Sequence, residues 1–315
     1  MNEPQTPGSE LIGDRTGFIV LAIAAVFIAT WLYMQSRPAT PSPTVPALQG
    51  ATDLMRFRED AWYLPSDELL GFVEISAGTF AMGSNPAIDA QAFENERWSP
   101  SQFQGTVALP TFYIGRYEVT VAQYRAFVVA AHYKADAQAL NAPGSQPVTH
   151  VSWTDALAFA RWLTATLKES EQAPAPLKEL LNEGWQFSLP TEAQWEKAAR
   201  GIDGRIFPWG NSPSKEHANF GNSAVTAVGH FSCADCAHGL ADMSGNLWEL
   251  TRSPYQPYPY DESDDANDLR SDALWVMRGG SFGDAVNLVR TATRGGVDPG
   301  ARRPFVGFRI VLTQM

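Results

Sequence analysis

The chain has 315 residues, of which 44% are hydrophobic and 18% are charged, so it can bury a substantial core and is not expected to be disordered as a whole. Its net charge of −11 argues against nucleic-acid binding, because a phosphate-binding surface requires clustered lysine and arginine. Its two cysteines are too few for a disulfide scaffold.

A long apolar segment lies near the N-terminus, after a tail of residues 1–16. No charged residue occurs between Arg15 and Arg37, and about 20 apolar residues in a helix span roughly 30 Å, the thickness of the hydrocarbon core of a bilayer. A cleaved signal peptide is one alternative, although its front end is normally basic and this one carries three acidic residues. A buried core helix is another, without an amphipathic stripe to support it. The segment therefore predicts a transmembrane helix over residues 17–36.

Residues 37–70 are predicted to be a proline-rich stalk and lead-in. Four prolines occur between Arg37 and Gly50 among serine, threonine and alanine, which favours an extended, semi-rigid spacer. Such a spacer would lift a globular domain off a membrane surface. One arginine on each side of the apolar segment gives little basis for its orientation. We expect a single-pass protein of a bacterial-type inner membrane, with the globular domain in the periplasm.

Residues 71–315 are predicted to form one domain. Residues 72–75 are typical of a strand, and residues 78–83 of a hairpin bounded by glycines. Helical regularity is lost in the second half, where turn-rich clusters follow one another, and a last strand is predicted at residues 306–312. No internal repeat is visible, and no linker after Gly50 divides the domain.

Three helices are predicted in the first half of this domain. Thr120 can cap the first, and Ser152 with Asp155 three positions later resembles a capping box that opens the second. Thr191 opens the third helix, and Gly201 suits its C-terminal end. Each helix has an apolar face, so all three are expected to pack against the core.

These motifs, in this order, resemble the sulfatase-modifying-factor family, that is, the formylglycine-generating-enzyme domain. The matching segments are residues 75–83, 117–120, 147–153, 189–196, 208–210, 239–249, 278–281 and 307–309. The resemblance covers about residues 71–313. It implies a compact α+β fold, related to the C-type lectin fold, with little regular secondary structure.

The resemblance also indicates which chemistry is absent. In formylglycine-generating enzymes two cysteines after the Gly-Gly-Ser segment bind copper as thiolates and oxidise a substrate cysteine, whereas the aligned positions here are Asp284 and Val289. A soft Cu(I) site requires sulfur, so we expect this reaction to be absent and assign no catalytic residue. Trp248, Ser281 and Arg294 still match cleft-lining positions, and Asp284 is assigned to the same cleft. Arg294 could bind a carboxylate or phosphate there, or form a structural ion pair.

Calcium is the cofactor that the resemblance implies. The carboxylates of Asp242 and Glu249, with the backbone carbonyls of Gly245 and Leu247, would supply the hard oxygen ligands that calcium prefers. The alternative is that Asp242 caps a turn and Glu249 pairs with an arginine.

A second calcium site of the family would use Asn219 and the carbonyl of Phe220. Its partner loop is shortened between Asn222 and Thr226, which makes this second site doubtful.

Cys233 and Cys236 lie between His230 and His238, so four possible soft ligands occur within nine residues and could bind zinc. Outside the cytoplasm a disulfide between the two cysteines is an alternative, and inert thiols are another. A redox role would favour a cysteine at a helix N-terminus, which this loop does not offer. The five histidines show no helical His-x3-His spacing, so a transition-metal centre is not expected.

Three functions are compatible with these features. The first is a non-catalytic accessory or scaffold subunit of a larger membrane protein complex on the periplasmic side. The second is a metal-dependent oxidoreductase that uses a non-cysteine site, and the third is a lectin-like ligand-binding module. The tyrosine- and proline-rich segment 254–260, with the acidic run 261–272 after it, is either a solvated insertion or a docking loop.

Overall fold

The computed structural model describes four stretches of the chain, residues 67–171, 173–231, 233–265 and 273–314. The predicted tail (1–16) and transmembrane helix (17–36), with most of the predicted stalk, lie outside them. Within these stretches no helix is both long and apolar enough to cross a membrane. The described residues combine helices and strands, which confirms the predicted α+β class.

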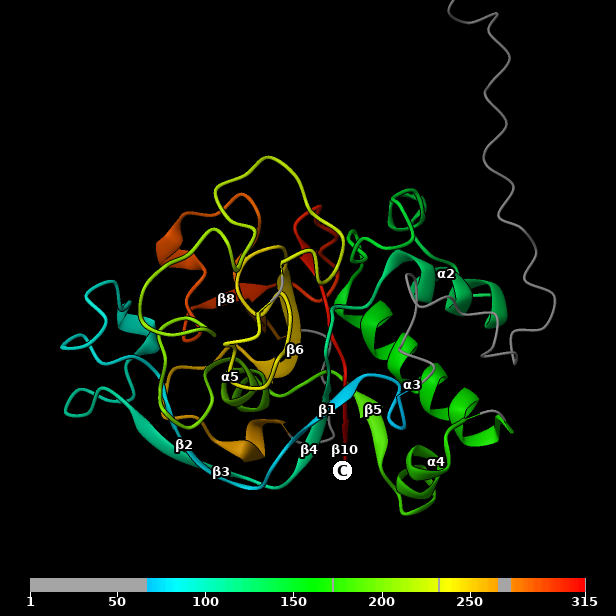
Figure 1. Cartoon of the computed structure of the whole chain (residues 1–315), viewed down its shortest axis with the longest axis horizontal. Coiled ribbons are helices and arrows are strands. Elements are labelled where there is room, and N and C mark those ends of the chain that lie inside the picture. The colour runs from blue at the N-terminus through cyan, green and yellow to red at the C-terminus, as the bar shows by residue number, and fades with distance from the viewer. Residues whose placement is uncertain (1–66, 172, 232, 266–272, 315) are drawn as a thin grey trace, which may run out of the picture. The chain divides into compact units, whose positions relative to one another are not determined.

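A four-stranded antiparallel sheet brings together strands from both ends of the domain (Figure 1). In spatial order its strands are β1 (Phe72–Ile75), β4 (Phe112–Gly115), β10 (Val311–Thr313) and β5 (Gln186–Ser188). β1 confirms the predicted first strand. β10 is buried along its whole length between β4 and β5, so the C-terminal strand completes the centre of this sheet.

The predicted hairpin over residues 78–83 is wrong. The segment is a single strand, β2 (Gly78–Met82), which pairs with β3 (Gly105–Leu109) in a two-stranded sheet. Gly83 has a φ of 92°, and its N–H donates to Glu196 Oε1 at 2.8 Å. The chain therefore leaves the strand at Gly83 towards the interior instead of folding back on itself.

The third sheet is built from strands that lie between residues 248 and 307. In spatial order its strands are β8 (Arg294–Val297), β7 (Trp275–Arg278), β6 (Trp248–Pro254) and β9 (Val306–Gly307), with β9 parallel to β6. The predicted last strand at 306–312 is thus two strands, β9 and β10, in different sheets. Between the two strands, Arg309 Nε donates to the buried carboxylate of Glu249 at 2.6 Å.

The three predicted helices are confirmed, each with a two-way capping box. They are α2 (Val121–Ala130), α3 (Trp153–Glu169) and α5 (Glu192–Arg200), capped by the pairs Thr120–Gln123, Ser152–Asp155 and Thr191–Gln194. Gly201 ends α5 with a φ of 67°. A further helix, α4 (Ala175–Asn182), was not predicted; it starts after Pro174 and buries Leu177 and Leu181.

Short 3-10 helices connect several of these elements: η2 (Glu94–Glu96), η3 (Ala137–Leu140), η4 (Glu262–Asp265) and η5 (Val286–Leu288). Helices α2, α3 and α4 lie on one side of the domain, whereas α5 lies among the strands (Figure 1). All residues of α5 are buried, including four that carry a charge. The core therefore contains charged groups that need partners inside the protein.

Candidate functional site

Three of the predicted cleft residues meet around one carboxylate. Asp284 Oδ2 accepts hydrogen bonds from Trp248 Nε1 (2.8 Å), from the Ser281 backbone N–H (2.8 Å) and from Ser281 Oγ (2.7 Å). Trp248 begins β6, and Ser281 follows a turn after β7 in which Gly280 has a φ of 72°. A Cβ on Gly280 would lie 2.6 Å from a backbone carbonyl oxygen, so the turn requires glycine. Asp284 Oδ2 is fixed by these three donors.

Val289, the second aligned position, is a core residue. Its side chain is fully buried in an apolar cluster with Ile206, Phe207, Ala218 and Phe220. The Ser244 hydroxyl donates to its backbone carbonyl at 2.5 Å. The position therefore offers neither a ligand atom nor access to solvent.

Arg294, the fourth predicted cleft residue, is held in a different set of contacts. Its Nε and Nη2 donate to the two carboxylate oxygens of Glu192 at 2.6 and 2.8 Å. The rings of Tyr255 and Tyr258 lie 5.1 and 4.0 Å from its guanidinium carbon. This is the structural ion pair that the sequence left open, because the charge of Arg294 is already matched by a carboxylate.

A cavity of about 390 Å³ lies beside this pair. Its lining includes Glu94 and Arg97, at the start of η2 and just after it, and Tyr255, Pro257 and Tyr258 from the segment after β6. The volume falls within the range of small-ligand pockets, and tyrosine and proline give it apolar walls with polar groups at the rim.

The 242–249 turn, where calcium was predicted, divides into two parts with different contacts. Glu249 is fully buried and accepts from Arg309 Nε (2.6 Å), Arg309 Nη2 (2.6 Å) and Trp195 Nε1 (2.7 Å). Its charge is matched by one arginine. Arg309 also donates to the carbonyl of Ala241, so it anchors the start of the turn as well.

Asp242 is in the opposite situation. Its Oδ2 accepts from the Gly229 N–H at 2.8 Å, but its Oδ1 is buried without a hydrogen-bond partner. Glu118 behaves in the same way: Oε2 accepts from Asn246 Nδ2 at 2.8 Å, and Oε1 is buried without a hydrogen-bond partner. The two side chains are only 5% and 1% exposed.

This arrangement changes the acidity of both groups. Burial raises the pKa of Asp242 from 3.8 to about 6, against the opposing effects of the Gly229 N–H and Arg309. Burial, together with Asp242 and Glu249, holds the pKa of Glu118 well above 4.5. The pair can therefore hold a proton, or it can bind a cation through the two unpartnered oxygens.

The fit to calcium is partial. Asp242 has a free, buried oxygen lone pair, whereas Glu249 is committed to Arg309. Among the residues that the structure describes, no three His, Cys, Asp or Glu side chains are grouped as metal ligands, so an ion here would need backbone carbonyls such as those of Gly245 and Leu247. The sequence interpretation did not assign Glu118 to this site; the signal was a single charged residue inside the otherwise uncharged 117–121 segment.

In the doubtful second calcium site, the side chain of Asn219 is engaged in other hydrogen bonds. The Asn219 side-chain amide donates to the Ala224 carbonyl (3.0 Å) and to Asn246 Oδ1 (3.1 Å), and its Oδ1 accepts from Asn222 Nδ2 (2.8 Å). Phe220 packs in the apolar cluster of Val289. Asn219 thus supports the 242–249 turn through Asn246.

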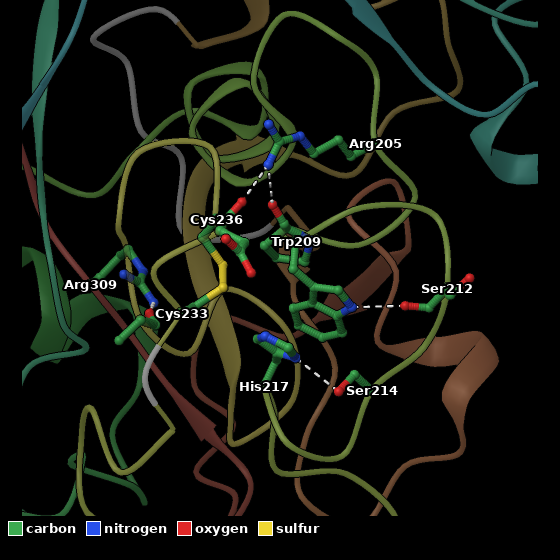
Figure 2. Close-up of a disulfide and its surroundings, with 11 residues drawn as sticks. Arg205, Trp209, Ser212, Ser214, His217, Cys233, Cys236 and Arg309 are labelled. Atoms are coloured by element: carbon green, nitrogen blue, oxygen red, sulfur yellow. Dashed lines mark hydrogen bonds between the residues drawn. A yellow bond between two sulfur atoms is a disulfide. The ribbon is translucent and has the colours of Figure 1, made fainter.

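Cys233 and Cys236 form a disulfide within one turn of the loop (Figure 2). His217 and Trp209 stack nearby with ring centroids 5.2 Å apart, and His217 Nδ1 is hydrogen-bonded to Ser214 Oγ at 2.8 Å. The disulfide removes both sulfur atoms from the thiolate state that a zinc site requires.

The sequence matches a known domain family and several characterised proteins. Residues 63–314 match the family model described as the sulfatase-modifying factor enzyme 1-like domain. The hercynine oxygenase of Mycolicibacterium smegmatis is 28% identical over 289 residues, covering 76% of this chain and 60% of that protein. The formylglycine-generating enzyme of Thermomonospora curvata is 27% identical over 321 residues, covering 78% and 94%.

A third relative is named as inactive. The inactive C-alpha-formylglycine-generating enzyme 2 of Mus musculus is 32% identical over 182 residues, covering 52% of this chain and 48% of that protein. The chain spans 60% and 56% of the length of two hercynine oxygenases that it matches.

Solved structures show the same fold. PvdO from Pseudomonas aeruginosa superposes with a TM-score of 0.60 at 24% identity, covering 76% of this chain and 93% of that chain. Treponema denticola variable protein 1 superposes with a TM-score of 0.56 at 22% identity, covering 76% and 94%. At these identities the similarity concerns the fold alone.

Proposed function

This chain belongs to the family of sulfatase-modifying factor enzyme 1-like domains, and we propose that it does not generate formylglycine. We further propose that it acts as an accessory or scaffold subunit of a larger membrane protein complex, with its domain on the periplasmic side. A transmembrane helix over residues 17–36 would be its anchor.

The observation that carries the first proposal is the state of the two positions where the active enzymes have cysteine. Asp284 has one carboxylate oxygen occupied by Trp248 and Ser281, and Val289 is sealed in an apolar cluster. Neither can act as a thiolate ligand for a soft metal. A relative named as inactive among the matches agrees with this proposal.

The direct test is an assay of the purified full chain with copper and a cysteine-containing peptide. We expect no peptide aldehyde by mass spectrometry at any copper concentration. The double variant Asp284→Cys, Val289→Cys is the matched comparison, provided that its near-ultraviolet circular dichroism matches the wild type. Aldehyde formed by the wild-type chain would disprove the proposal.

The scaffold role needs a separate experiment, because loss of one reaction does not show what replaces it. The native mass of the chain after gentle detergent extraction, with mass spectrometry of whatever accompanies it, would report an assembly. We expect a large stoichiometric complex. A chain that always migrates alone would contradict this role and direct attention to the cavity.

We also propose that calcium binds at the 242–249 turn through Asp242. The support is the unpartnered Oδ1 of Asp242, and we infer that Glu118 takes the place of the second carboxylate because Glu249 is paired with Arg309. When bound, the ion would neutralise charge and tie the loop at Gly229 to the turn. It is assigned no step in a reaction.

A ligand-binding module is the second candidate function. The observation that favours it is the cavity of about 390 Å³ lined by Tyr255, Tyr258 and Arg97. Screening the full chain against glycan and peptide arrays tests it. Binding that disappears in Tyr258→Ala but persists in Arg161→Ala, a change of an exposed residue of α3, would support this function over the scaffold.

A further inference from the structure

The disulfide between Cys233 and Cys236 closes a very short loop. The two cysteines are the only ones in the chain and are three residues apart. Both are partly exposed, and Ala234 and Asp235 between them are exposed. A cross-link of this span removes little freedom from the unfolded chain, because the stabilisation grows with the length of the loop that is closed. Stabilisation of the fold is therefore a weak reason for this bond.

The turn is also held without the disulfide. The Cys236 N–H donates to the Cys233 carbonyl at 3.2 Å, and the Ala237 N–H donates to the Pro208 carbonyl at 3.3 Å. Arg205 Nη1 donates to the carbonyls of Asp235 (2.6 Å) and Pro208 (3.1 Å), so one guanidinium clamps the turn onto the neighbouring segment (Figure 2). The two sulfur atoms would stay in the same turn after reduction.

The surroundings of the turn are suited to thiol chemistry. A guanidinium beside a cysteine stabilises its thiolate, and Arg205 contacts the backbone between the two cysteines. His238, two residues after Cys236, is half-buried, and its Nε2 has no hydrogen-bond partner. Burial, followed by the nearby charges of Lys197 and Arg205, lowers the pKa of His238, so its ring is neutral at pH 7.

The negative charges near the turn oppose this effect only in part. Asp203 pairs with Arg205 Nε at 2.9 Å and offsets some of its charge, but the Asp203 side chain is 56% exposed and Asp235 is exposed as well, so water screens both carboxylates. His230 lies on the N-terminal side of the loop, near Asp242. The sequence offered no helix N-terminus to activate a cysteine here; the structure supplies Arg205 instead.

We propose that Cys233 and Cys236 form a redox-active couple that accepts two electrons from a dithiol. A thiolate of the dithiol attacks one sulfur of the disulfide, the bond between Cys233 and Cys236 breaks, and a mixed disulfide forms. The released cysteine leaves as a thiolate and takes up a proton. The second thiolate of the dithiol then attacks the mixed disulfide and releases the other cysteine. The dithiol becomes a disulfide, and two electrons and two protons pass to the protein.

The first test is the equilibrium of the full chain with mixtures of reduced and oxidised glutathione at neutral pH. After acid quenching and maleimide labelling, mass spectrometry gives the fraction of dithiol form. We expect both forms to be populated across these mixtures while the near-ultraviolet circular dichroism stays unchanged. A disulfide that opens only when the chain unfolds would overturn the proposal.

A second test separates a chemical role of Arg205 from a structural one. In the reduced chain, the rate of alkylation against pH gives the pKa of the reactive thiol. We expect Arg205→Gln to shift this profile to higher pH and to slow alkylation about tenfold below the midpoint, since one pKa unit is a factor of ten. Arg161→Gln, an exposed change of the same charge on α3, should leave it unmoved. Identical profiles for all three proteins would contradict the proposal.

Discussion

Two regions of buried charge in this domain are neutralised in different ways. Around α5, arginine meets carboxylate directly: Arg278 forms ion pairs with both Glu192 and Glu196. At the 242–249 turn, Glu118 and Asp242 are equally buried, but neither forms an ion pair within the described residues. The carboxylates around α5 therefore have arginine partners within the domain, whereas Glu118 and Asp242 have none among the described residues.

This difference distinguishes charged side chains that are paired within the fold from buried carboxylates that have no counter-charge. An ion removed from water must be compensated by a counter-charge, a proton or a bound ion, because desolvation alone is unfavourable by several kcal/mol. The pairs around α5 meet this need internally and therefore fix the packing of that helix. The Glu118–Asp242 pair has no ion-pair partner among the described residues, so we expect its charge to follow pH and cation concentration.

The largest effect is expected where the two regions meet, at Arg309. Replacement in Arg309→Leu would leave Glu249 buried with Trp195 Nε1 as its remaining donor, close to Glu118 and Asp242. Loss of one partner of a buried pair typically destabilises by about 3–5 kcal/mol. Urea unfolding of the full chain in detergent measures this change in the free energy of unfolding.

The control for Arg309 is an exposed pair. Arg97 and Glu94 lie 3.7 Å apart, with 29% and 86% of their side chains exposed. Glu94→Gln should change the free energy of unfolding by less than about 0.5 kcal/mol. Equal losses in the two variants would mean that buried charge in this domain is not held by specific pairs.

Calcium is expected to have the next largest effect. If the ion binds the folded chain alone, a concentration of about 100 times its dissociation constant stabilises by about 2.7 kcal/mol. Asp242→Asn should abolish this gain, and Asp298→Asn, a change of an exposed acid, should preserve it. In calcium-free buffer at pH 8, Asp242→Asn should instead raise the free energy of unfolding, because it removes an unpaired buried charge.

The sequence predicted contacts between near neighbours in the chain but not contacts between remote residues. The capping boxes at Thr120, Ser152 and Thr191 were predictable, because each is complete within four residues. The pairs that fix α5 were not, since their partners are remote: Arg278 reaches Glu192, which lies 86 residues earlier. A pattern along the chain contains no signal for such a contact.

The candidate site shows the same limit. The sequence placed Asp242 and Glu249 in one turn, but the assignment of Arg309 to Glu249, and not to Asp242, depends on the break between β9 and β10. Glu118 joins the site from before α2, and only the fold brings it to Asn246.

The pH dependence of stability is a smaller and sharper probe. The pKa of Asp242 rises from 3.8 to about 6 on folding, so between these values the folded state binds more protons than the unfolded state. The stabilisation is therefore complete below about pH 4 and is lost as pH rises through about 6. We expect a decrease of about 1–3 kcal/mol across this window in calcium-free buffer.

Two variants separate the contribution of Asp242 to the pH dependence from that of a second buried carboxylate. Burial also raises the pKa of Asp265 from 3.8 to about 6, so Asp265→Asn and Asp242→Asn should each remove part of the pH dependence. Calcium should flatten the Asp242 part alone, because bound metal requires the deprotonated carboxylate. A calcium response that stays in Asp242→Asn would place the ion elsewhere.

Asp284 lies between the two extremes, and the smallest effect is expected there. Its carboxylate has neither an arginine nor an unpartnered buried oxygen; three hydrogen bonds from Trp248 and Ser281 hold one oxygen, and the side chain is partly exposed. Asp284→Asn keeps an acceptor but removes the charge, so the loss should be about 1 kcal/mol, the difference between charged and neutral hydrogen bonds. Asp284→Leu also removes the acceptor, so its free energy of unfolding should be lower than that of Asp284→Asn by about 1–2 kcal/mol, because the Trp248 N–H loses its partner. Urea unfolding of both variants measures this order. If Asn and Leu were equivalent, the carboxylate would not be anchoring Trp248, and its place at the former cysteine position would need a chemical explanation.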